Sequence, residues 1–165
     1  PFVAVYHPSE EGETPLSADA VEYFGDSENF IGIKITSPNR TDYLFNRLEE
    51  GLDMTCRDMR FNGVYAAVGE APDGYPEYLF MGEGQLLEKG AWRIHSKTPG
   101  AQVSLSRNGD AFALVSSSEI QLRIPLRDGK PPVVYATSEP DKRLPSARRG
   151  DVCTFTLPAG RYWIR

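Results

Sequence analysis

The chain has 165 residues, of which 40% are hydrophobic and 11% aromatic, the size and composition of one globular domain. Its formal net charge of −5 argues against nucleic acid as a partner, because phosphate backbones select basic surfaces. No apolar stretch approaches the roughly 18 residues of a membrane-spanning helix, so no membrane partner is expected. We expect a single domain over residues 1–165 and, since the chain starts at Pro1, a C-terminal module of a larger protein.

Two elements are expected near the start of the chain. Residues 2–8 read as a strand that ends in His-Pro. Ser17 is a favourable helix N-cap, and a short helix is expected from there to Phe24, ending near Gly25. No long helix is expected, because 15 glycines and 13 prolines interrupt the chain.

From residue 31 onward, apolar and polar residues alternate with a period of two. The clearest runs cover residues 31–35, 103–106, 120–124 and 153–157. Such alternation predicts strands with one face in the core and one in water, so Ile31, Ile33 and Ile35 are expected to point inward.

Turn signals separate these runs. They are Asn62-Gly63, Asp73-Gly74, Asn108-Gly109, Asp128-Gly129 and Pro158-Ala159-Gly160. Asn-Gly and Asp-Gly tolerate the positive φ angles of tight hairpins, and the clearest hairpin runs from Val103 to Val115. Residues 138–151 read as a polar, basic loop. The pattern predicts an all-β protein, an antiparallel β-sandwich of about ten to twelve short strands with at most one short helix.

Neither a metal site nor a cofactor site is indicated. The histidines are His7 and His95, and no Cys-x-x-Cys or His-x-His spacing occurs. Cys56 and Cys153 form one long-range disulfide in an oxidising compartment or, alternatively, remain two buried thiols.

Catalytic motifs are also missing from the sequence. No Gly-x-Ser-x-Gly elbow is present, and no glycine loop that could hold a phosphate precedes a helix. No catalytic residue is therefore predicted, and the chain is not expected to be an enzyme on its own.

Aromatic and basic residues supply the binding candidates. Exposed aromatic rings can stack on pyranose rings, and arginine forks match carboxylates and sulfates. The alternatives are aromatic rings that fill the core and a basic loop that is merely solvated. On the binding interpretation, the predicted glycan-binding residues are Trp92, Arg93, His95, Arg148, Arg149, Tyr162 and Trp163.

A family resemblance covers roughly the first hundred residues. Five segments in this order resemble the C-terminal β-sandwich of heparinase II/III-like and oligoalginate lyase-like polysaccharide lyases: residues 2–8, 31–35, 42–45, 61–68 and 79–90. The run Leu157–Ile164 looks like the final strand of many bacterial accessory sandwiches.

The resemblance implies an N-terminal (α/α) toroid that cleaves uronate-containing polysaccharides by β-elimination. The family's catalytic tyrosine, asparagine and histidines would all precede Pro1. We therefore expect a secreted or periplasmic, non-catalytic accessory module that supports the catalytic domain and binds acidic glycan. The alternative is a structural or protein-interaction sandwich without glycan binding.

Overall fold

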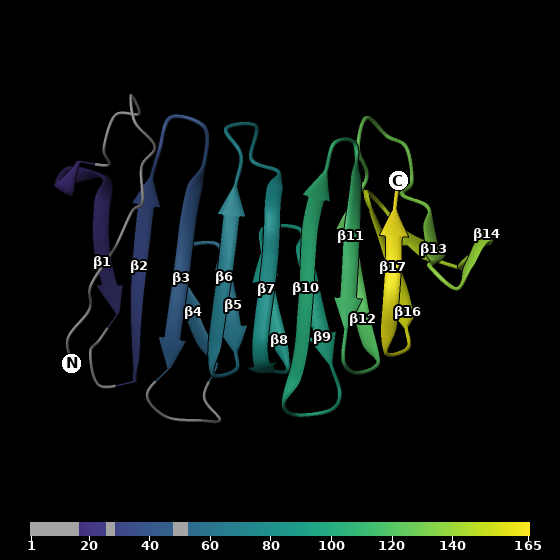
Figure 1. Cartoon of the computed structure of the whole chain (residues 1–165), viewed down its shortest axis with the longest axis horizontal. Coiled ribbons are helices and arrows are strands. Elements are labelled where there is room, and N and C mark those ends of the chain that lie inside the picture. Colours follow the sequence, from purple (N-terminus) through teal and green to yellow (C-terminus); the bar gives the residue numbers. More distant parts are fainter. Residues whose placement is uncertain (1–16, 26–28, 48–52) are drawn as a thin grey trace.

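The computed structural model describes residues 17–25, 29–47 and 53–165 (Figure 1). Within these ranges the chain folds into two layers of antiparallel strands, which confirms the predicted all-β sandwich. The strand expected over residues 2–8, which contains His7, lies outside the described residues. No helix in the described ranges is long and apolar enough to cross a membrane.

The larger sheet has ten strands in the described part of the chain. Their spatial order is β1 (Val21–Gly25), β2 (Phe30–Thr36), β3 (Thr41–Arg47), β6 (Tyr65–Glu70), β7 (Pro76–Gly84), β10 (Ala101–Asn108), β11 (Ala111–Ser116), β17 (Gly160–Ile164), β13 (Val134–Ala136) and β14 (Glu139–Arg143). The predicted hairpin from Val103 to Val115 is confirmed as β10 and β11.

The smaller sheet has seven strands and lies behind the larger one in Figure 1. Their order is β15 (Ala147–Arg149), β16 (Val152–Leu157), β12 (Ile120–Pro125), β9 (Trp92–Ser96), β8 (Leu86–Lys89), β5 (Met59–Asn62) and β4 (Met54–Cys56). Hairpins supply three of the six neighbouring pairs, β4–β5, β8–β9 and β15–β16. Longer connections join the other three, β5–β8, β9–β12 and β12–β16.

The core fills the space between the sheets. Three of the predicted alternating runs, at residues 103–106, 120–124 and 153–157, do turn their apolar residues inward. Leu105, Leu122 and Phe155 are each at most 1% exposed. These strands are the ones that face the opposite sheet, so their alternation follows the core directly.

The run at residues 31–35 turns the other way, and the expectation for it was wrong. Gly32 on β2 is the register partner of Phe45, which is only 3% exposed and belongs to the core. Ile33 is instead the partner of Leu44, which is 36% exposed. Directly paired residues share one side of a sheet, so the isoleucines lie on the outer face.

The short helix expected from Ser17 to Phe24 was also wrong. The described chain contains only a 3₁₀ turn over Ala18–Ala20, and residues Val21–Gly25 form β1. Every residue of β1 has a register partner on β2. Pairing with a neighbouring strand therefore outweighs the weak local preference for a helix.

The sequence also underestimated the number of strands, since the structure describes 17. Residues 138–151, expected to be a loop, contain β14 and β15. Both strands are exposed along their whole length. They have no buried face, so hydrophobic alternation could not predict them.

Cys56 and Cys153 do not form the disulfide considered from sequence, and both are free. They lie on β4 and β16, and four strands of the smaller sheet separate these two. Five strand spacings amount to about 24 Å. A disulfide requires Cα atoms roughly 4.4–6.8 Å apart, so the pairing is excluded.

Candidate functional site

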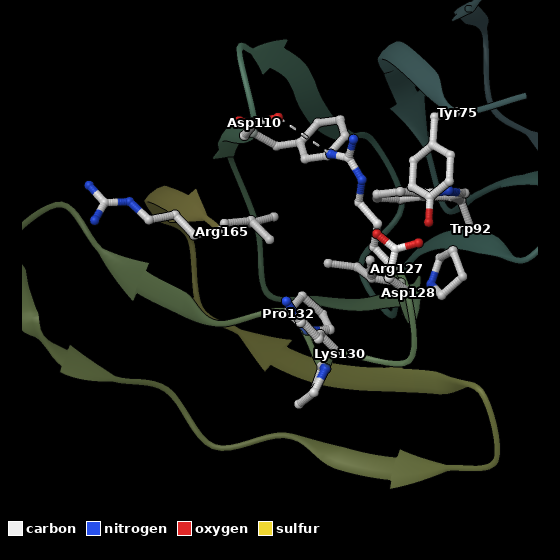
Figure 2. Close-up of a pocket in the computed structure, with 13 residues that line it drawn as sticks. Tyr75, Trp92, Asp110, Arg127, Asp128, Lys130, Pro132 and Arg165 are labelled. Atoms are coloured by element: carbon white, nitrogen blue, oxygen red, sulfur yellow. Dashed lines mark ion pairs between the residues drawn. The ribbon is translucent and has the colours of Figure 1, made fainter. Parts of the chain in front are cut away.

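A cleft of about 560 Å³ opens at one end of the sandwich (Figure 2). Its floor is made of aromatic and aliphatic side chains from both sheets and from the connection between β6 and β7: Tyr75, Trp92, Phe112, Ile124 and Ile164. Trp92 meets Tyr75 edge to face, with ring centroids 6.1 Å apart, and its centroid lies 5.2 Å from that of Phe112. The floor is thus a continuation of the core that remains open at the end of the sandwich.

A tight turn builds one wall of the cleft. Arg127 and Lys130 pair through two backbone hydrogen bonds, of 3.3 and 2.9 Å, around Asp128 and Gly129. Asp128 has a φ of 52° and Gly129 a φ of 72°. Two consecutive positive angles are typical of a type I′ turn, which confirms the turn predicted from Asp128-Gly129. The turn presents Arg127 and Lys130 at the rim of the cleft.

Charged side chains line this rim. Arg127, Lys130 and Arg165 contribute three positive charges, and Asp110 and Asp128 two negative ones. Figure 2 shows Arg127 between Tyr75 and Asp110. Its guanidinium lies 5.6 Å from the centre of the Tyr75 ring and 3.7 Å from Asp110. Local charge at the cleft is therefore positive although the whole chain is acidic.

The Arg127–Asp110 pair is weak. The Asp110 side chain is 98% exposed and that of Arg127 49%, and such surface pairs contribute only about 0–1 kcal/mol. An incoming anion can consequently replace Asp110 as the partner of Arg127. An aromatic wall, a concave shape and exchangeable cations are the features of a pocket for a small anionic ring, and its volume lies in the usual range of ligand pockets.

Two of the residues predicted to bind glycan are buried instead. Trp92 is 5% exposed and forms part of the cleft floor, where its ring packs against Tyr75 and Phe112. Tyr162 is also 5% exposed, and its hydroxyl donates a 2.7 Å hydrogen bond to the Pro158 carbonyl. The sequence pattern could not show that both rings fill the core.

The remaining predicted residues lie on three different surfaces. Arg93 and His95 project from β9 on the outer face of the smaller sheet, where they pair with Arg123 and Gln121. Arg148 and Arg149 are exposed on the edge strand β15. Trp163, 37% exposed, lies on the outer face of the larger sheet. The structure does not bring the seven residues together, and glycan contact by the five accessible ones stays a prediction.

Sequence reasoning missed the cations of the cleft. Arg127 and Lys130 flank an Asp-Gly pair that was recognised as a turn. A two-residue hairpin sets its flanking residues side by side, so this turn was the signal from which the neighbouring cations could have been found. Nothing in the sequence indicated that Tyr75 would lie beside them. Among the residues that the structure describes, no group of three or more His, Cys, Asp or Glu could hold a metal.

Comparison with known families gives one match. Residues 18–106 match the family model for the endo-acting ulvan lyase C-terminal domain. No curated protein matches the chain. The matched region includes Tyr75 and Trp92 of the cleft floor, but the Arg127 turn lies beyond it.

Proposed function

The chain belongs to the endo-acting ulvan lyase C-terminal domain family, a non-catalytic accessory module of a polysaccharide lyase, and we propose that it binds acidic glycan for such an enzyme. A lyase of this kind removes a proton next to a carboxylate and stabilises the enolate that results. In our proposal this chemistry belongs to another domain, and the sandwich holds the polysaccharide. The kinship with heparinase II/III-like lyases and export from the cytoplasm are parts of the same proposal.

The observation that carries glycan binding is the geometry of the cleft. Tyr75 offers an aromatic surface, and Arg127 lies over it at 5.6 Å, held to Asp110 only by a long ion pair of 3.7 Å. Lys130 stands on the same turn. A sugar ring against Tyr75 would bring its acidic substituent within reach of both cations, because they share one rim.

The test is electrophoresis in native gels that contain ulvan. Replacing both cations, Arg127→Gln with Lys130→Gln, should reduce the retardation of the protein by ulvan. A matched control removes two exposed cations away from the cleft, Lys97→Gln with Arg161→Gln, and should migrate with unchanged retardation apart from its charge. Equal loss of retardation in both variants would contradict a role for the cleft.

The outer face of the larger sheet favours a second function. A row of register partners crosses seven strands and carries Tyr23, Ile33, Leu44, Ala67, Phe80, Ser104 and Val115. We call this row, together with Trp163, the apolar face. The four exposed large hydrophobic residues of the described chain are Tyr23, Leu44, Val115 and Trp163, and all lie on it.

An apolar surface of this length is typical of a protein interface, since six strand spacings span about 30 Å. The proposed occupant is the catalytic domain of the same lyase, because the matched family is a C-terminal domain of such an enzyme. In this alternative the sandwich supports the catalytic domain and binds no glycan.

Charge on the apolar face distinguishes the two functions. In the full-length lyase, Leu44→Lys with Val115→Lys should separate the thermal unfolding of the two domains and speed proteolysis between them. Gln121→Lys with Thr156→Lys, which are register partners on the outer face of the smaller sheet, is the control. Unchanged domain coupling in the Leu44/Val115 variant would rule out this interface.

A further inference from the structure

A row of arginines crosses the outer face of the smaller sheet, opposite to the apolar face. Arg60 on β5 pairs with Glu88 on β8, Glu88 with Arg93 on β9, and Arg93 with Arg123 on β12. We call these four residues the arginine row. Register partners project from the same side of a sheet, and neighbouring strands are about 4.8 Å apart. The row is therefore a line of charges about 14 Å long, fixed by backbone pairing.

Glu88 holds the three guanidinium groups in place. Its carboxylate lies 3.3 Å from Arg93, 3.4 Å from Arg60 and 3.6 Å from Arg123, and its own side chain is only 13% exposed. The arginine side chains are more accessible, at 38% for Arg93, 49% for Arg60 and 33% for Arg123. The carboxylate thus lies beneath a layer of guanidinium groups that face outward.

Most hydrogen-bond donors of these arginines remain available. A guanidinium has five donors in a planar fork. Among the described residues, Arg123 donates to the carbonyl of Ala91 at 3.1 Å, and Arg60 to Asp53 at 3.3 Å. Arg93 Nε is buried and makes no hydrogen bond, so its attachment to Glu88 is electrostatic only, and the terminal nitrogens of Arg93 are the donors that an external anion can reach. The guanidinium groups of the row are held in fixed orientations but still have unused hydrogen-bond donors, which favours binding of an external anion.

The surroundings suit a chain rather than a single ion. Gln121 and Thr154, which flank Arg123 on neighbouring register positions, can hydrogen-bond to hydroxyl groups. Pro125 lies two residues after Arg123 on the same side of β12, and it lines the cleft. The arginine row and the cleft are consequently connected along the surface of β12.

We infer that the arginine row is a second binding surface for an anionic polysaccharide, whose carboxylate or sulfate groups are held by Arg93 and Arg123. The bound polysaccharide lies across the strands, because the arginine row crosses them. This inference rests on the proposed glycan binding and extends it from one ring in the cleft to a chain over the sheet. Both surfaces then bind one polymer and raise its apparent affinity.

The test compares three double variants that each remove two positive charges. Arg93→Gln with Arg123→Gln changes the row, Arg127→Gln with Lys130→Gln changes the cleft, and Lys97→Gln with Arg161→Gln is the control. In native gels containing ulvan, the row variant should lose about tenfold or more in apparent affinity, as expected for charge-assisted hydrogen bonds. The control should keep the wild-type affinity, and raising the salt concentration should weaken the wild type more than the row variant.

The outcomes separate the row from the proposed function. If the row variant binds like the control while the cleft variant is weakened, the row is overturned and the proposed function stands. If ulvan does not retard the wild-type protein, both the arginine-row inference and the proposed glycan binding are wrong. Competition with polygalacturonate identifies carboxylates as the recognised groups, and competition with λ-carrageenan identifies sulfates. Equal competition by neutral dextran would overturn the row as an anion site.

Glu88 provides a test of opposite sign. The variant Glu88→Gln removes a negative charge from the middle of the row, so it should bind ulvan more tightly than the wild type while its melting temperature falls. If the arginines only stabilised the sheet, this variant would lose stability without a gain in binding. Weaker or unchanged retardation would therefore contradict the inference.

Discussion

The hydroxyl of Tyr78 on β7 donates a 2.8 Å hydrogen bond to Asp42 on β3, although β6 lies between the two strands. The phenol ring reaches across Gly69, which is the register partner of both residues. A Cβ atom on Gly69 would lie 2.3 Å from the ring. The absence of a side chain at position 69 is what allows the hydrogen bond to span three strands.

Substitution at this glycine should therefore disturb the tyrosine. Gly69→Ala forces the Tyr78 ring away and separates its hydroxyl from Asp42, with an expected loss of about 1–3 kcal/mol in the free energy of unfolding. Urea denaturation measures this. In a Tyr78→Ala background the same change should cost much less, because the obstructing ring is gone. If the losses in unfolding free energy from Gly69→Ala and Tyr78→Ala were additive, the proposed coupling between the two positions would be contradicted.

Alkaline pH should destabilise the fold. Burial and the hydrogen bond to Asp42 raise the pKa of Tyr78. Burial alone would lower the pKa of Lys89, but its hydrogen bonds to Asp58 and Glu70 outweigh this and raise it. Both pKa values are raised on folding, so the associated stability is complete below the unfolded values of about 10 and is lost as pH rises through the folded values.

Urea midpoints at a series of pH values from 8 to 12 check this expectation. The free energy of unfolding should fall from about pH 10 upward. Tyr78→Phe should show a shallower fall, because it lacks one of the raised groups. A Tyr23→Phe control, which changes a ring that is 59% exposed, should keep the full decrease. Identical pH profiles for all three proteins would exclude Tyr78 as a contributor.

The hydroxyl of Tyr162 should contribute measurably to stability. It is buried and donates to the Pro158 carbonyl in the turn that connects β16 to β17. Tyr162→Phe removes the donor and should cost about 1 kcal/mol, the usual contribution of such a hydrogen bond. Thermal unfolding measures the change. Tyr135→Phe, in a half-buried position on β13, is the comparison, and an equal effect of both would argue against a special role for the Pro158 contact.

The two cysteines should react at very different rates. Cys153 is fully buried, whereas Cys56 is partly exposed, with burial raising the pKa of its thiol. Iodoacetamide should therefore modify Cys56 slowly in the native protein and Cys153 only after unfolding, which mass spectrometry can follow. Reducing agent should leave the melting temperature unchanged. A drop on reduction would indicate a disulfide and contradict the strand order.

Prediction of the candidate site from sequence was partial. Trp163 lies on the opposite face of β17 from Tyr162 and Ile164, as the alternation of residues along a single strand requires. Alternation alone does not determine which of the two faces of β17 is exposed. Trp92 is followed by Arg93 in the sequence, yet strands from both sheets enclose its ring, and their arrangement is not encoded within β9.

Several local elements of this protein follow from its sequence alone. Alternation identified β10, β12 and β16, and Asn108-Gly109 and Asp128-Gly129 identified turns, because side-chain period and positive φ depend only on neighbouring residues. The strand pairing of the folded chain sets two further features: the isoleucines of β2 face outward, and Arg60, Arg93 and Arg123 form one row. These relationships depend on which strands pair and in which register, and a shift of one residue reverses every face.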